Sequence, residues 1–417
     1  MSILLKGVRV IDPAAGVDAE TDVLLANGLV ERLGPGPVPG DCEVFEANGL
    51  VVCPGLIDVH VHFRQPGQEH KETIATGSRA AAMGGYTQVV CEPNTLPPID
   101  DESGLAGVQA TAEKDAVVRV LFKCAMTVRQ DGFELVDVEQ VKAAGAVALS
   151  DDGEPVLRDG VMRRALMGAR EHGLLVTPHC EESQRSRTTD PWPQAYRREP
   201  DLVARDLALA AETGGRMHIS HLSTAEGASL LAGAKAAANS VSGEVTPHHL
   251  ALSQESAGNN TNAKTNPPLR TQQDVEALNE ALGDGVIEVI ASDHAPHSPE
   301  EKKVKWQDAP FGTIGLETAL GVVLTHLVGK GRIPVSHAIA AMSSNPSRIF
   351  GLRGGTLAVG STADVTLIDL GKKWVVDPES FQSKGRNCAF AGWKLKGRAV
   401  GTIVGGKWVM REGQLLV

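Results

Sequence analysis

The sequence lacks the features of a membrane-bound or nucleic-acid-binding protein. No apolar run approaches the length that spans a bilayer, and the apolar run in MSILLKGVRVID is too short for a signal peptide. No cluster of Lys and Arg forms a basic face, and the formal net charge of the 417-residue chain is −11. These absences argue against nucleic acid or a membrane as the partner and favour a small molecule or a protein.

Paired cysteines are also missing. The six cysteines are scattered along the chain, and none belongs to a CxxC pair. Such scattering is typical of reduced, mostly buried thiols in a cytoplasmic protein. We therefore expect a cytoplasmic location.

The two ends of the chain share one pattern. Residues 1–52 and 355–417 alternate apolar and polar positions between Gly, Pro and Asn-Gly turn signals, which predicts antiparallel strands. We expect these two segments to combine into one small β-sandwich domain. Residues 53–354 are then expected to form a separate, larger catalytic domain.

Short apolar runs alternate with Ala- and Leu-rich helical stretches in this larger part. The eight runs are LIDVHVH, YTQVVCEPN, VVRVLFKCAMT, AVALSDD, LLVTPH, RMHISH, SGEVTPHH and VIEVIASDHAPH. Alternation of strand and helix predicts a parallel sheet, and eight units predict a closed (β/α)8 barrel of the TIM type, an α/β fold. The alternative is a doubly wound open sheet, but HVHFRQPG stands where that fold normally has a Gly-rich phosphate loop.

Polar residues gather at the carboxyl ends of these runs, which in a barrel form the rim where catalytic groups collect. His60 and His62 share one face of the first strand because side chains alternate along a strand. Together with further ligand types on other strand ends, they predict a metal site more strongly than two structural core histidines. The further ligand candidates are His179, His221, Asp293 and one of Asp151 and Asp152.

Imidazole and carboxylate ligands without thiolate suit Zn²⁺ or a similar divalent ion, one or two per chain, in a catalytic site. Adjacent residues of a strand face opposite ways, so only one of Asp151 and Asp152 is expected to point inward. Asp293 is the candidate acid/base that passes a proton to a leaving nitrogen. His297 is a candidate for binding substrate or orienting Asp293, with an ordinary loop histidine as the alternative.

Arg64 follows the first strand, where a guanidinium can hold a substrate carboxylate through two parallel hydrogen bonds. A surface salt bridge is the alternative. Asn94 and Asn266 are candidates for the same carboxylate or a ring carbonyl, although Asn beside Pro is more often a turn residue. His248 and His249 are candidates for supporting a ligand or a loop from behind.

Several segments carry a resemblance to a known family: GLIDVHVHFRQPG, HKETIATGSRAAAMGGYTQVVCEPNT, LSDDGEP, HCEE, HISHLST, EVTPHHL, KTNPPLR, ASDHAPH, EKK and APFG. Over nearly its whole length the sequence resembles the dihydroorotases of the amidohydrolase superfamily, in the bacterial group whose metal bridge is an aspartate. The resemblance implies a zinc-dependent enzyme that reversibly closes N-carbamoyl-L-aspartate to L-dihydroorotate in pyrimidine biosynthesis. It also implies a metal-bound hydroxide as nucleophile and Asp293 as general acid/base.

The resemblance assigns a role to each matching position, and the spacing from His60 favours Asp152 over Asp151 as the bridge. The implied metal ligands are His60 and His62 for one zinc ion, Asp152 between the ions, His179 and His221 for the second ion, and Asp293. The implied substrate contacts are Arg64 and Asn94 at the carboxylate, then Asn266, His297 and, through their backbone, Phe311 and Gly312.

The sequence departs from the family pattern in four places. Gln65 stands where the family usually has Glu, Glu92 where it has Met, and Pro178 where it has Ala. The stretch between His179 and His221 is shorter than usual, and its middle, SQRSRTTDPWPQAYRREP, matches poorly. The shorter stretch affects the expected rim loop within 183–200 rather than the metal ligands.

Two other functions compete with this one. A hydantoinase- or allantoinase-like cyclic amidase would bridge its metals with a carboxylated lysine where LSDDG stands, and would lack an arginine placed as Arg64 is. A non-catalytic, dihydroorotase-like scaffold for aspartate transcarbamoylase would have lost metal ligands, whereas all the ligand positions are present here. The resemblance also allows a homodimer, and an association with aspartate transcarbamoylase that coexists with activity.

Overall fold

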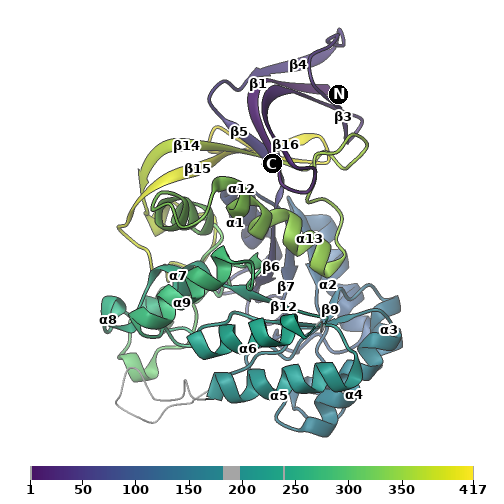
Figure 1. The fold of residues 1–417 in the computed structure, drawn as a ribbon, viewed down its shortest axis with the longest axis vertical. Coiled ribbons are helices and arrows are strands. Elements are labelled where there is room, and N and C mark those ends of the chain that lie inside the picture. Colours follow the sequence, from purple (N-terminus) through teal and green to yellow (C-terminus); the bar gives the residue numbers. More distant parts are fainter. Residues whose placement is uncertain (1, 182–197, 238–239, 417) are drawn as a thin grey trace.

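The computed structural model describes residues 2–181, 198–237 and 240–416. Figure 1 shows a β-rich part that holds both ends of the chain, above a larger part in which strands are surrounded by helices. Among the helices of the described residues, none combines the length and apolar character needed to cross a membrane.

Eight short parallel strands form the larger part: β6 (Leu56–Val61), β7 (Tyr86–Cys91), β8 (Arg119–Phe122), β9 (Ala148–Leu149), β10 (Leu175–Val176), β11 (Met217–Ile219), β12 (Val241–Val245) and β13 (Val289–Ile290). Hydrogen bonds join β6, β7 and β8 in that order in one sheet, and the five strands from β9 through β13 in a second sheet. Single parallel bridges, Cys124 with Leu149 and Val61 with His294, connect the two sheets at both edges. The ring is therefore closed, which confirms the predicted (β/α)8 barrel over the open sheet.

Helices follow the strands around the barrel (Figure 1). They are α1 (Ile74–Gly84), α2 (Glu102–Asp115), α3 (Val138–Ala143), α4 (Asp159–Glu171), α5 (Arg198–Thr213), α6 (Ala225–Ala236), α7 (Pro247–Ala251), α8 (Gln254–Ala257), α9 (Gln272–Gly283), α10 (Pro299–Lys302), α11 (Ala319–Val323), α12 (Val335–Ile339) and α13 (Asn345–Phe350). Several begin at an N-cap whose side chain accepts a first-turn N–H: Thr73, Asp101, Asp137, Thr224 and Thr271. Such caps each contribute about 1 kcal/mol and fix where the helix starts.

The two ends of the chain form one nine-stranded sheet, as the sequence predicts for the small β domain. Its strands are β1 (Ser2–Asp12), β2 (Val17–Ala26), β3 (Leu29–Leu33), β4 (Cys42–Glu46), β5 (Val51–Pro54), β14 (Val365–Val375), β15 (Lys394–Val404), β16 (Lys407–Arg411) and β17 (Gln414–Leu415). The join is the antiparallel pairing of β5 with β14, in which Val52 lies opposite Leu367. Both residues belong to a buried apolar cluster shared by the two ends. The domain limits at residues 52 and 355 stay a prediction.

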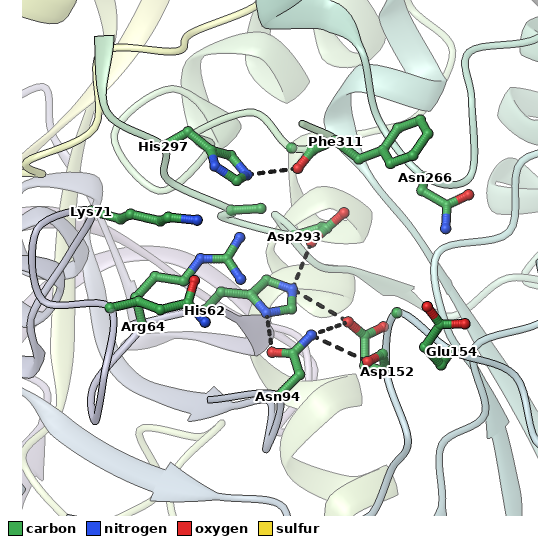
Figure 2. Close-up of a pocket in the computed structure, with 14 residues that line it drawn as sticks. His62, Arg64, Lys71, Asn94, Asp152, Glu154, Asn266, Asp293, His297 and Phe311 are labelled. Atoms are coloured by element: carbon green, nitrogen blue, oxygen red, sulfur yellow. Dashed lines mark hydrogen bonds and ion pairs between the residues drawn. The ribbon is translucent and has the colours of Figure 1, made fainter. Parts of the chain in front are cut away.

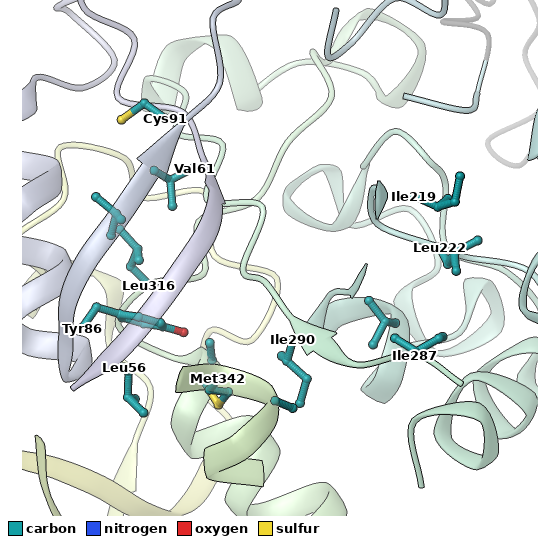
Figure 3. Close-up of a cluster of buried hydrophobic side chains, with 14 of the residues drawn as sticks. Leu56, Val61, Tyr86, Cys91, Ile219, Leu222, Ile287, Ile290, Leu316 and Met342 are labelled. Atoms are coloured by element: carbon teal, nitrogen blue, oxygen red, sulfur yellow. The ribbon is translucent and has the colours of Figure 1, made fainter. Parts of the chain in front are cut away.

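Buried apolar side chains fill the barrel part and hold its strands in place. Figure 3 shows part of this cluster, with Leu56, Val61 and Tyr86 from the first two strands and Ile290 from the last. All four are fully shielded from solvent. Burial of one such side chain contributes roughly 1.5–3 kcal/mol, so the cluster gives the strand ends a rigid support.

The segment 376–393, between β14 and β15, leaves the terminal sheet and packs on the barrel. Phe381, Cys388 and Phe390 form a buried cluster with Ile314 and Val322. Residues from the C-terminal part of the chain therefore lie close behind the loop that follows β13.

Candidate active site

The six predicted metal ligands are buried at the carboxyl ends of the barrel strands. They are His60 within β6, His62 just after it, Asp152 after β9, His179 after β10, His221 after β11 and Asp293 after β13. The closed barrel brings these ends to one rim, so side chains separated by more than 200 residues meet at one centre.

Asp152 lies in the middle of the histidines. Its Oδ1 is 3.4 Å from His60 Nε2, 3.4 Å from His179 Nδ1 and 3.3 Å from His221 Nε2. Its Oδ2 is 3.5 Å from His62 Nε2. One carboxylate therefore faces four imidazoles.

Asp151 points elsewhere, which resolves the alternative left open by the sequence. Its Oδ1 accepts hydrogen bonds from the backbone N–H groups of Met126 and Thr127, at 2.8 and 3.1 Å. Asp151 is buried and supports the turn after β8, so the loop conformation directs only Asp152 to the centre.

Asp293, which follows the last barrel strand, β13, is the sixth member of the cluster. Its Oδ1 is 3.1 Å from His62 Nε2 and 3.8 Å from His60 Nε2. Asp293 and His221 both have positive φ, 46° and 32°. Non-glycine residues adopt this conformation only when their surroundings enforce it, and such positions concentrate at functional sites.

The donor set fits a divalent cation. Two groups of three buried side chains have ligand atoms within 4.8 Å of one another: His60, His62 and Asp293, and His60, Asp152 and His221. His60 Nδ1 lies 2.6 Å from Glu244 Oε1 and, as the donor there, leaves the Nε2 lone pair facing Asp152 and Asp293. Among the described residues, His60 Nε2 has no hydrogen-bond partner. A lone pair and carboxylates repel each other unless a proton or a metal cation lies between them, so these residues could hold a metal ion.

The electrostatics of the cluster agree with this interpretation. Burial by itself lowers the pKa of His60, but the carboxylates of Glu92, Asp152 and Glu244 raise it well above its usual value. Burial by itself raises the pKa of Asp152, yet the surrounding histidines hold it well below its usual value. The site therefore attracts positive charge and keeps the central carboxylate ionised.

A cavity of about 370 Å³ opens beside the cluster. Figure 2 shows Arg64 and Lys71 on one side of it and Glu154 on the other. The predicted substrate contacts Arg64, Asn94, Asn266, His297, Phe311 and Gly312 all line it, together with His62, Asp152 and Asp293. The volume is of the size that holds a small ligand.

Arg64 is held so that its guanidinium enters this cavity. Its φ is 59°, and its Nε donates to the carbonyl of Pro296 at 3.3 Å. Within the described chain, its terminal nitrogens make no hydrogen bond, so they can receive a carboxylate.

The two asparagines touch two of the predicted metal-ligand histidines as well as the cavity. Asn94 Oδ1 lies 2.8 Å from His62 Nδ1, and its Nδ2 donates to Asp152 at 3.2 Å. Asn266 Nδ2 lies 3.0 Å from His179 Nε2. Both contacts fix the orientation of a histidine, a supporting function in addition to the predicted contact with substrate.

Other side chains support the loops around the site. His249 Nε2 donates to the carbonyl of Pro267 at 3.2 Å, which is the loop-supporting role considered for it. His248 is buried, and burial lowers its pKa to about 4. Gln65, one of the departures from the family pattern, accepts the N–H of Ile74 at 3.0 Å and so supports the start of α1.

Sequence reasoning missed several residues at this rim. Lys71 lines the cavity and pairs with Glu301 at 3.1 Å, and both belong to segments that carried the resemblance. Arg270 donates to Glu181 and to Ser223, each at 2.9 Å, and so ties together the segments that follow His179 and His221. Only the folded chain shows these contacts, because their partners are far apart in sequence. The expected rim loop within 183–200 lies mostly outside the described residues.

Comparison with known proteins agrees with the geometry. A family model described as the amidohydrolase family matches residues 51–409. A dihydroorotase from Pelotomaculum thermopropionicum is 46% identical, over 99% of this chain and 99% of its own length. A dihydroorotase from a Geobacter species is 44% identical, over 99% of this chain and 100% of its own.

Solved structures show the same fold at lower identity. An L-hydantoinase (dihydropyrimidinase) from Arthrobacter aurescens superposes with a TM-score of 0.91 at 26% identity, covering 100% of this chain and 97% of its own. A dihydropyrimidinase from Brevibacillus agri superposes with a TM-score of 0.90 at 25% identity, covering 100% and 96%. The chain belongs to the amidohydrolase family, in the group of the dihydroorotases.

Proposed function

We propose that this protein is a metal-dependent dihydroorotase, which interconverts N-carbamoyl-L-aspartate and L-dihydroorotate in pyrimidine biosynthesis. The observation that carries the proposal is the position of Arg64, whose guanidinium lines the cavity next to the buried histidine–aspartate cluster. A cyclic amide that bears a carboxylate can place that carboxylate on Arg64 and its reacting carbonyl at the cluster. The dihydroorotase relatives, 44–46% identical over nearly the whole chain, support the same substrate.

We propose that the resident ion is zinc, with two subsites that share Asp152. The ligand types and the four imidazoles around this carboxylate support both points. When bound, the metal would polarise the substrate carbonyl and lower the pKa of a water molecule.

Asp293 is positioned to move the proton. In the hydrolytic direction, the oxygen of one water bonds to the ring carbonyl carbon, and the bond from that carbon to the ring nitrogen breaks. Asp293 takes the proton from the attacking water and delivers it to the departing nitrogen. Its carboxylate lies 3.1 Å from His62 Nε2 and also lines the cavity, so it can contact both the reacting water and the ring.

The other cavity residues would hold the ring. Arg64 binds the carboxylate, and Asn94 and Asn266 bind polar groups of the substrate from either side. Figure 2 shows His297 and Phe311 at the far wall of the cavity, away from Asn94. Gly312, the neighbour of Phe311 in sequence, lines the cavity with them. Fixing the ring in one orientation removes much of the entropy cost of the reaction.

A cyclic amidase for rings without a carboxylate is the second candidate, because the hydantoinases share the fold. The two functions are separated by comparing turnover of L-dihydroorotate and dihydrouracil, which have the same ring with and without the carboxylate. We expect strong preference for L-dihydroorotate, lost in Arg64→Met and partly kept in Arg64→Lys, which retains the charge. Equal turnover of both rings by the unaltered protein would favour the second candidate.

A homodimer, an association with aspartate transcarbamoylase and a cytoplasmic location are proposed on the family resemblance. All six cysteines are free thiols, which agrees with a reducing compartment. The mass of the purified protein, alone and mixed with the transcarbamoylase, tests both assemblies.

A further inference from the structure

Asn387 lies behind the substrate cavity although it belongs to the C-terminal part of the chain. It is within the segment 376–393 that leaves the terminal sheet between β14 and β15, and only 2% of its surface is exposed. Neither the strand pattern nor the metal ligands account for a buried amide at this position.

The side chain of Asn387 uses its hydrogen-bonding groups on two cavity loops. Its Nδ2 donates to the carbonyls of Ala295 and Gly312, both at 3.0 Å. Its Oδ1 accepts the backbone N–H of His297 at 3.0 Å. Ala295, Gly312 and His297 all line the cavity, so one amide connects the loop after β13 with the loop that carries Gly312.

The backbone of the same segment reinforces this connection. The carbonyl of Asn387 accepts the N–H of Ile314 and the hydroxyl of Thr313, both at 3.0 Å. Gly385 packs so closely that a Cβ there would lie 2.8 Å from side-chain atoms of Ile314 and Pro296. A side chain would therefore push the segment away from the cavity wall.

The segment is itself anchored to the barrel. Glu317 accepts the backbone N–H of Gln382 at 2.8 Å, and Glu72 accepts the hydroxyl of Ser383 at 2.5 Å. Both glutamates are on the barrel, and both lie at least 65 residues from these partners in sequence. These hydrogen bonds hold the segment against the barrel and so fix the position of Asn387 beside the cavity loops.

We propose that Asn387 is a positioning residue for substrate binding, which holds His297 and the backbone at Gly312 at the spacing that the ring requires. This inference rests on the proposed function, because those two positions are the substrate contacts of its far wall. The side-chain hydrogen bonds of Asn387 go to Ala295, His297 and Gly312, and none of these is a predicted metal ligand. Its loss should therefore weaken substrate binding and leave the metal centre intact.

The test is the variant Asn387→Asp, which keeps the size and the acceptor for His297 but replaces the two-proton donor group. We expect KM for L-dihydroorotate to rise about tenfold or more, with kcat within about twofold and metal content unchanged. Asn387→Leu, which removes all three hydrogen bonds, should raise KM further.

Asn279 provides a matched control. It is also a buried asparagine whose Nδ2 donates to two carbonyls, those of Leu250 and Val275, at 3.0 and 2.7 Å, but it does not line the cavity. Asn279→Asp should lower the unfolding temperature and leave KM unchanged. An unchanged KM in Asn387→Asp, or an equal rise in both variants, would overturn the inference alone. An unaltered protein that does not turn over L-dihydroorotate would overturn the proposed function, and the inference with it.

Discussion

Lys123 and Glu92 form an ion pair inside the barrel, where both side chains are fully shielded from solvent. The pair explains one of the departures from the family pattern, since Glu92 stands where the resemblance leads one to expect Met. Glu92 Oε1 also lies 3.6 Å from Nδ1 of the metal-ligand candidate His60. The glutamate is therefore neutralised by a lysine that directly follows the neighbouring strand β8, immediately beside the site.

We expect single substitutions of this pair to destabilise the protein strongly. Glu92→Met or Lys123→Met leaves a buried charge without its partner, which costs roughly 3–5 kcal/mol. The double variant Glu92→Met/Lys123→Met removes both charges and should recover most of that loss. Urea unfolding of the four proteins measures the coupling, and a double variant as unstable as the sum of the two single losses would contradict it.

Glu317 should make stability depend on pH. Burial raises the pKa of its carboxyl to about 8 in the folded protein, against an ordinary value of 4.5. The unfolded chain therefore ionises first, and the free energy of unfolding should fall as pH rises from 4.5 towards 8, by up to about 1.4 kcal/mol per pH unit.

The variant Glu317→Gln isolates this effect, because its amide oxygen can still accept the N–H groups of Gln382 and Ser383. We expect it to gain stability over the unaltered protein as pH rises from 5 to about 8. Glu113→Gln, at an exposed position of α2, is the control and should show no such trend. Parallel stability curves for Glu317→Gln and the unaltered protein would exclude this role of burial.

The barrel and the position of its metal-ligand candidates can be predicted from the sequence, because strand and helix signals depend on residues that are close together in the chain. Strand and helix alternate in the order that a barrel requires, and a strand end places its polar residues on one rim. The amino-acid pattern alone therefore groups His60, His62 and Asp293 at one site.

The rest depends on contacts that only the closed fold creates. The strand pattern does not separate Asp151 from Asp152, and only the family resemblance favours Asp152. The conformation of one turn decides which of them faces the histidines. Lys123 and Asn387 lie 31 and at least 75 residues from the partners that explain them. Neither spacing is a recognisable motif, because buried pairs across a fold have no fixed separation.

Removal of the metal should lower thermal stability as well as activity. Without a cation, the nitrogens of His60 and His62 face Asp152 and Asp293 directly. A ligand that binds only the folded state stabilises it by about 2.7 kcal/mol at a hundredfold excess over its Kd. We expect the unfolding temperature to fall after chelation and to recover with zinc, and Asp152→Ala to lose most of this response. Equal unfolding temperatures for metal-free and zinc-loaded protein would contradict the assignment of the cluster.

The direction of the reaction should depend on pH. N-carbamoyl-L-aspartate has two carboxylates and L-dihydroorotate one, so ring closure consumes a proton. The equilibrium ratio of ring to open form should therefore fall about tenfold for each unit of rising pH. Both species can be measured after approach from either side at pH 6 and pH 8. A ratio that does not change with pH would refute the proposed reaction.

The central claim is that this chain opens and closes a carboxylate-bearing cyclic amide at the histidine–aspartate cluster. The most direct measurement is turnover of L-dihydroorotate by the zinc-loaded protein, with Asp293→Ala measured in parallel. We predict turnover by the unaltered protein and its loss in the variant, because Asp293 is the proposed proton carrier. An unaltered protein that holds zinc but leaves L-dihydroorotate intact would contradict this claim.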